Sequence, residues 1–241
     1  MSRLRILTLI FPALLIAGPA WAGIVVHKDG SGNPATCTET TDNIFNIGTP
    51  NAAIAVGDLL VLTMSGVGDL DSSSLLSGIT APAGVGPFQF AKSISAVYDP
   101  NGGGRSYIAY AKTTAAFTDG VGITVTANKT TFMGGCLYDV SGLAGILDAQ
   151  AAIEISNTAL SANATPVVVN SIAAEFGVMI DSCQNTIGSS PVNSPWISAG
   201  INGAGGCPAG YLVTARPGLL LQAVGNQSGP GSAATGIALF R

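Results

Sequence analysis

A succession of short alternating segments separated by turn-forming residues constrains the fold of this chain more than any other feature. The clearest case lies between Ser106 and Leu143, where apolar and small polar residues alternate through Val121–Ala127. After the turn-prone Asn128 and Lys129, the segment Phe132–Val140 keeps the same period of two. This period places successive side chains on opposite faces of a strand. The pattern predicts that the two segments pair as antiparallel strands.

Comparable segments follow one another along the chain, about a dozen in all, with little that favours helix. The segment Leu147–Ile155 is the main ambiguous one, because its composition fits a short helix and its flanking turns fit a strand. Many short strands with turn signals between them are typical of two packed antiparallel sheets. The sequence therefore predicts an all-β, jelly-roll-like two-sheet sandwich.

The predicted strands fall into two similar sets. Four segments of the first half are matched in order by four of the second, with an offset that falls from about 117 to about 100 residues: Gly57–Val61, Tyr107–Lys112, Ile123–Asn128 and Gly134–Val140, then Ala174–Ile180, Tyr211–Arg216, Leu220–Asn226 and Thr235–Arg241. A repeat of this kind fits a duplication within one sandwich or two small domains. We favour one domain, residues 23–241, because about five strands alone would leave an apolar face open.

The single-sandwich interpretation predicts one central core that contains residues from both halves. Phe240 is expected to take the place of Tyr138 in the second copy. The expected core members are Val121, Ile123, Val125, Phe132 and Tyr138, beside Leu220, Val224, Ile237 and Phe240.

The first 22 residues have the features of a secretory signal peptide. Arg3 and Arg5 precede an apolar run, Ile6–Ile16, and Gly18-Pro19 leads to the small-residue site Ala20-Trp21-Ala22. This order predicts cleavage after Ala22 and an extracellular or periplasmic protein, an uncleaved anchor being the alternative. No later stretch reaches the ~18 apolar residues of a membrane span, so we expect no transmembrane helix in the mature chain.

The four cysteines all lie in the segment expected to be exported. An even number in an oxidising compartment predicts two disulfides, and four cysteines allow three pairings. We favour Cys37 with Cys136 and Cys183 with Cys207, because the second pair closes a short loop between adjacent predicted strands. Metal binding by these cysteines is disfavoured, since none is spaced as a zinc pair and the chain has one histidine.

Charge narrows the classes of partner. Only 9% of the residues are charged, the net charge is −4, and the basic side chains are scattered singly. Nucleic acids and anionic membranes bind clustered Lys and Arg, so neither is expected as a partner. Low charge lowers the electrostatic barrier to self-association, which leaves a second copy or a glycan as the expected partner.

The sequence is poor in groups that could catalyse a reaction, and we assign no catalytic residue. His27 is the only histidine and is expected at the surface or a strand edge. Asp139 and Asp181 lie in apolar strands, where a carboxylate must be solvated, paired or functional. Strand alternation turns Asp139 away from the face of Tyr138 and Val140, and hence toward solvent.

Ligand binding therefore rests on a short list of candidates, namely Trp196, Asp139 and Asp181. Trp196 is expected to be the best exposed aromatic for stacking on a sugar ring. No cofactor is expected, although the loops with Asp69, Asp71 and Asp99–Gly102 offer oxygen ligands of the kind that calcium takes.

Several soft motifs resemble a known fold family. They are GDLLVLTMSG from Gly57, TAPAG from Thr80, GGCLYDVSGL from Gly134, LDAQAA from Leu147 and the terminal GIALFR. Together they resemble the concanavalin-like jelly-roll domains of bacterial secreted and phage-encoded proteins. The resemblance implies a sandwich and an extracellular context, and it implies no activity.

The expected function is that of a secreted, non-enzymatic β-sandwich acting as a structural or adhesive surface module. One alternative is a carbohydrate-binding or carbohydrate-active domain. Another is a subunit of an extracellular fibre, in which Gly23–Lys28 adds to the sheet edge of a neighbouring copy.

Overall fold

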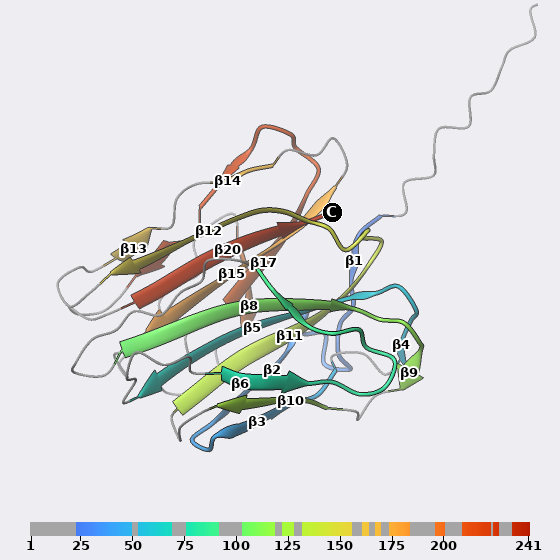
Figure 1. The fold of residues 1–241 in the computed structure, drawn as a ribbon. Coiled ribbons are helices and arrows are strands. Elements are labelled where there is room, and N and C mark those ends of the chain that lie inside the picture. The colour runs from blue at the N-terminus through green and yellow to red at the C-terminus, as the bar shows by residue number, and fades with distance from the viewer. Residues whose placement is uncertain are drawn as a thin grey trace, which may run out of the picture.

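A computed structural model of the chain describes residues 23–49, 53–68, 76–91, 103–118, 122–127, 132–155, 161–163, 167–169, 174–183, 196–200, 209–222, 224–226 and 233–241. Every secondary-structure element within these ranges is a β-strand, and all their pairings are antiparallel (Figure 1). The predicted all-β antiparallel fold is confirmed. The predicted signal peptide, residues 1–22, lies outside the described residues.

Two large sheets form the centre of the molecule. Sheet I has the order β1-β11-β5-β8-β7, and β2 also pairs with β11, continuing the edge that β1 begins. Sheet II has the order β12-β20-β15-β17-β16. The strands of sheet I are β1 (Val25–Val26), β2 (Thr36–Thr40), β5 (Leu59–Gly68), β7 (Gln89–Phe90), β8 (Gly103–Lys112) and β11 (Phe132–Ser141). Those of sheet II are β12 (Leu147–Ile155), β15 (Glu175–Cys183), β16 (Ile197–Gly200), β17 (Ala209–Thr214) and β20 (Ala233–Phe240).

The two large sheets pack face to face over a central core. Alternate residues of β5 and β11, such as Val61 and Tyr138, point from sheet I toward sheet II and are fully buried. Phe176, Val178 and Phe240 meet them from sheet II. Interdigitation of two apolar faces is the packing expected of a β-sandwich.

Shorter strands cover the outer faces of both sheets. A three-stranded sheet of β3 (Ile44–Ile47), β10 (Ile123–Ala127) and β6 (Leu76–Thr80) covers sheet I, and Figure 1 shows it below β11, β5 and β8. The remaining pairs are β4 (Ala53–Ile54) with β9 (Phe117–Thr118), β13 (Ser161–Asn163) with β19 (Val224–Asn226), and β14 (Val167–Val168) with β18 (Leu220–Leu221). Of these, β14 and β18 bury the outer face of sheet II. Burial on both faces explains why the first half of β5 is almost continuously apolar.

The strand register confirms that the two halves are similar. In sheet I, Val61 lies between Tyr110 of β8 and Tyr138 of β11. In sheet II, Val178 lies between Tyr211 of β17 and Ala238 of β20. The strand orders of the two sheets correspond position by position, and the pairs β4·β9 and β3·β10 have their counterparts in β14·β18 and β13·β19.

The register also corrects two predictions and decides one that the sequence left open. β10 does not pair with β11, since β10 joins β3 and β6 in the covering sheet. Ala238 takes the place of Tyr138, and Phe240 takes that of Val140, because Phe240 lies opposite Phe176 as Val140 lies opposite Leu59. The ambiguous segment Leu147–Ile155 is the strand β12.

The predicted single core is divided among three layers. Tyr138 and Phe240 share the central core, but Ile123 and Val125 lie beneath the sheet that covers sheet I, and Ile237 lies on the outer face of sheet II. Leu220 is 64% exposed, so its assignment to the core is wrong. Val121 and the side chains of Phe132 and Val224 lie outside the described residues. Period-two alternation identifies two faces of a strand, and it does not say that both faces are buried.

Candidate functional site

Trp196 is buried, which contradicts the expectation that it is exposed for stacking. Its side chain is 6% exposed, packs in the outer layer of sheet II, and donates its indole N–H to the carbonyl oxygen of Gln222 at 3.0 Å. A Cβ at Gly177 would approach Leu239 Cδ2 to 2.9 Å and Trp196 Cζ3 to 3.4 Å, so glycine there leaves room for Leu239 beside the indole ring. The backbone of Asp181 lies in β15 opposite Thr235, and its side chain is outside the described set.

Asp139 is fully buried, although strand alternation predicted that it faces solvent. The predicted direction is right, since Tyr138 and Val140 point into the central core and Asp139 points to the other side of β11. Solvent is excluded there because the face that carries Leu60 and Leu137 is covered by a further layer. The prediction was wrong because the sequence pattern does not show that this face is covered.

Asp139 belongs to a cluster with His27 and Asp58. One imidazole nitrogen and one oxygen from each carboxylate all lie within 4.8 Å of one another. Asp58 is 4% exposed, Asp139 is fully buried and His27 is half-buried. This cluster combines the only histidine of the chain with two buried acids, which makes it the principal candidate site within the described residues.

Local backbone structure positions the three side chains. His27 directly follows β1 and donates its backbone N–H to Asp139 O at 2.9 Å, so the two residues lie opposite each other across the sheet edge. Asp58 ends the turn between β4 and β5, where Gly57 adopts a φ of 93°. One carboxylate oxygen of Asp58 accepts the backbone N–H of Ala55 at 2.8 Å, which fixes the turn.

Sequence reasoning missed the participation of His27 and Asp58. Gly57-Asp58 is an ordinary turn signal, and His27 was expected at a surface or strand edge. The register of a two-residue strand brings His27 to Asp139, and such a register cannot be obtained from strand alternation alone.

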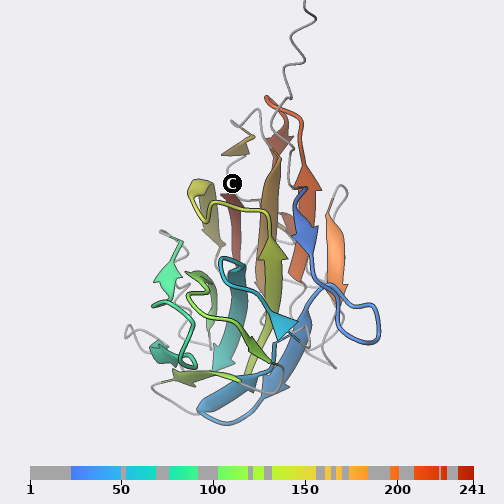
Figure 2. The ribbon, with the colours of Figure 1, turned by 90° about the vertical axis from the view of Figure 1, so that its right-hand side faces the viewer.

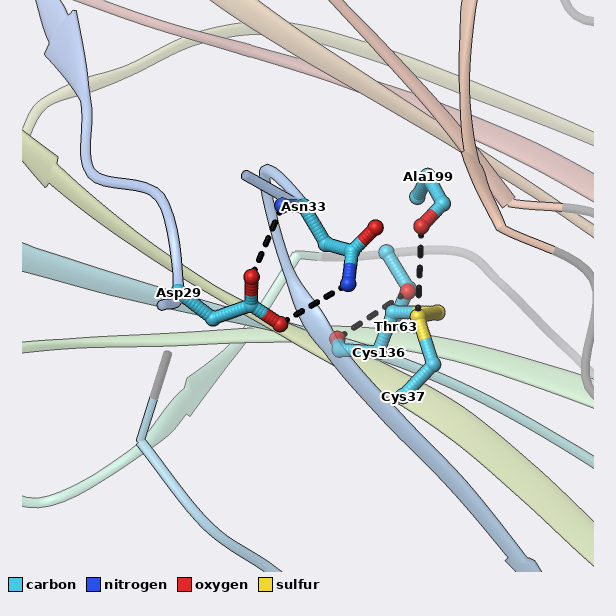
Figure 3. Close-up of a disulfide and its surroundings, with 6 residues drawn as sticks. All are labelled: Asp29, Asn33, Cys37, Thr63, Cys136 and Ala199. Carbon is cyan, nitrogen blue, oxygen red and sulfur yellow. Dashed lines mark hydrogen bonds between the residues drawn. A yellow bond between two sulfur atoms is a disulfide. The ribbon is translucent and has the colours of Figure 1, made fainter. Parts of the chain in front are cut away.

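The disulfide predicted between Cys37 and Cys136 is present (Figure 3). The two cysteines are register partners on β2 and β11 and are separated by 99 positions in the sequence. Thr63 Oγ1 donates to Cys136 O at 3.2 Å, and Cys37 Sγ lies 3.6 Å from Ala199 O of sheet II. Cys207 lies outside the described residues, so the second predicted pair stays a prediction.

Two surface features could contact a partner. A groove of about 390 Å³ is lined by β17 and by the segment that connects it to β18. Ile197 and Val213 line it and are 53% and 43% exposed. At the β7 edge of sheet I, the ring of Phe90 meets that of Tyr107 edge to face at 6.1 Å, and Phe90 is 49% exposed. The loops considered for calcium lie outside the described residues.

Comparison with known proteins gives no assignment. No protein family matches the chain, and no curated protein or solved structure is significantly similar to it. Within the described residues, no helix has the length and apolar character needed to cross a membrane.

Proposed function

We propose that this protein is a secreted, non-enzymatic structural module that associates with further copies of itself through the edge of sheet II. The observation that carries the proposal is the apolar groove at that edge, with Ile197 and Val213 exposed beside it. The Cys37–Cys136 disulfide supports an oxidising compartment. The soft resemblance to concanavalin-like jelly rolls supports the same extracellular context.

The edge itself favours a second copy as the partner. β16 is the last strand of sheet II, and no described strand pairs with its outer side. An unpaired edge offers backbone N–H and C=O groups to another strand, and charges on the edge normally prevent this. Here only 9% of the chain is charged, and Arg216 is the charged residue lining the groove.

Fibre assembly by addition of Gly23–Lys28 to a neighbour is a less direct proposal. Val25 and Val26 already pair with Ser141 and Val140 of their own chain. Assembly through that segment would require the neighbour to exchange it. Assembly through β16 requires no described strand to be displaced.

Introducing charge at the groove tests the proposal. The double variant Ile197→Lys, Val213→Lys should raise the dissociation constant for self-association at least about tenfold, because each lysine would lose water in the contact. Sedimentation velocity over a range of concentrations measures it. Val168→Lys, at a 41% exposed position on β14, is the matched control and should associate like the wild type. A wild-type protein that stays monomeric at every concentration would reject self-association.

A second function, glycan binding, is favoured by the β7 edge, where the exposed Phe90 meets the half-buried Tyr107. The Phe90 ring meets that of Tyr107 edge to face, and Tyr110 Oη donates a hydrogen bond to Gln89 Oε1 at 3.0 Å. Aromatic rings next to amide and hydroxyl groups can stack on and hydrogen-bond to sugars. Trp196 cannot supply the platform while it stays buried.

A glycan array tests this second function. Binding to one glycan class that falls at least about tenfold in Phe90→Ala and is unchanged in Ile146→Ala, another 49% exposed apolar residue, would support it. Retention of no glycan by the wild-type protein would exclude it.

A further inference from the structure

We propose that His27, Asp58 and Asp139 bind a divalent transition-metal ion that fastens the N-terminal segment of the mature chain to sheet I. The site is independent of the groove and of the proposed self-association. It joins three separate parts of the chain: the residue after β1, the turn before β5, and the last part of β11.

The first argument is charge. Asp58 and Asp139 are 4% and 0% exposed, and one oxygen of each lies within 4.8 Å of the other. Two negatively charged carboxylates held this close and away from water repel each other, and a cation between them offsets that repulsion. A single imidazole can supply one positive charge at most, whereas a divalent ion matches both carboxylates.

The second argument is the histidine. His27 Nε2 is buried, and it has no hydrogen-bond partner among the residues that the structure describes. A buried ring nitrogen normally has a hydrogen-bond partner or binds a metal. The nearest ligand atoms that could share a metal with it are one oxygen of each cluster carboxylate, within 4.8 Å.

The donor set selects the kind of ion. One imidazole nitrogen with two carboxylate oxygens suits Zn²⁺ and its first-row neighbours, whereas calcium and magnesium take oxygen ligands. In the tetrahedral geometry of structural zinc sites, bonds of about 2.1 Å place two ligand atoms about 3.4 Å apart. The three ligand atoms already lie within 4.8 Å of one another, so binding an ion requires them to approach by at most about 1.4 Å.

The third argument comes from the second half of the molecule, which has the same strand register without the cluster. The counterpart of Asp58 is Glu175, since each precedes the first core residue of its strand. In the second half, Leu239 takes the place of Asp139. Ala149 pairs with Leu239 in the way that His27 pairs with Asp139. The fold thus accepts apolar residues at both positions. Asp139 and His27 are not required to form these strands, which favours a role in binding.

The ion would stabilise a weakly held edge. β1 contributes two residues to sheet I, and Val25 is 49% exposed. Close packing holds the edge at one point, where Gly142 (φ 84°) lies so near the carbonyl oxygen of Gly23 that a side-chain Cβ at position 142 would not fit. A metal bond at His27 would fix the segment at its other end, beside Asp139.

The test uses the full exported chain after treatment with a chelator. Because His27 is the only histidine, its imidazole gives a single set of ¹⁵N side-chain resonances. Addition of Zn²⁺ should move one ring nitrogen to the shift of a metal-bound imidazole, with saturation at one equivalent. An imidazole that stays unchanged at several equivalents of Zn²⁺ and of Co²⁺ would overturn the proposal. An imidazole that stays protonated on both nitrogens when Zn²⁺ is added would also overturn the proposal, because it would show that His27 forms an ion pair with the carboxylates.

Variants taken from the second half separate binding from folding. His27→Ala with Asp139→Leu should keep the circular dichroism spectrum and weaken Zn²⁺ binding at least about 100-fold in competition with a chromophoric chelator. Glu175→Gln changes the corresponding acid of the other half and should bind Zn²⁺ like the wild type. Equal Zn²⁺ affinity in the double variant would place any bound metal elsewhere and reject the site. If the double variant does not fold, the imidazole resonances of the wild type decide the question.

Discussion

Replacing Cys37 and Cys136 together by alanine is expected to lower the free energy of unfolding by about 2–5 kcal/mol. The disulfide closes a segment with a sequence separation of 99, and a loop of that size restricts the unfolded chain strongly. Alanine is chosen because Cys136 is 3% exposed within the central core, where serine would add a buried hydroxyl. Guanidinium denaturation followed by circular dichroism measures the change.

This disulfide joins two neighbouring strands of one sheet, so it also fixes how they pair. Cys37 and Cys136 are direct partners on β2 and β11, so the bond holds the edge of sheet I in register. Hydrogen exchange should therefore accelerate first in Thr36–Thr40 when the bond is removed. Wild-type protein unfolded with a reductant should match the double variant. A loss below about 1 kcal/mol would show that strand pairing alone holds the edge.

Much of the fold could be predicted because strand periodicity and turn residues are local signals. Alternation in Phe132–Val140 correctly placed Tyr138 and Asp139 on opposite faces of β11. The repeat was also visible, since equivalent strands keep similar sequences, as in Tyr110 and Tyr211. These properties depend on neighbours along the chain, which the sequence states directly.

The layers and the candidate site could not be predicted for a related reason. Alternation says which residues share a face and leaves open what covers that face. Ile123 and Asp139 were misjudged in opposite ways, one assigned to the central core and one to solvent, although both lie on the covered outer side of sheet I. Pairing between distant segments decides this, and a two-residue strand such as β1 has too little sequence to show it.

Truncation of Tyr138 should have the second large effect on stability. Its ring is fully buried between the large sheets, with centroids 5.7 Å from Phe176 and 5.9 Å from Tyr211. Loss of a buried aromatic ring removes apolar contact and leaves a cavity, at a cost of about 3–5 kcal/mol. Tyr138→Ala is expected to lower the free energy of unfolding by this amount in chemical denaturation. A cost below about 1 kcal/mol would contradict close packing of the two sheets at this ring.

Tyr138→Phe is the matched control, and it separates the ring from its hydroxyl. It keeps the aromatic packing, so its stability at neutral pH should lie within about 1.5 kcal/mol of the wild type.

Burial raises the pKa of Tyr138 above its ordinary value of 10.0. The phenol therefore stabilises the fold below pH 10, and that contribution is lost as the pH rises above 10, where only the unfolded chain ionises. The decline reaches about 1.4 kcal/mol per pH unit in the wild type. Burial also raises the pKa of Tyr211, which leaves a residual slope in Tyr138→Phe. Equal slopes in the two proteins would show that the Tyr138 hydroxyl is accessible to water.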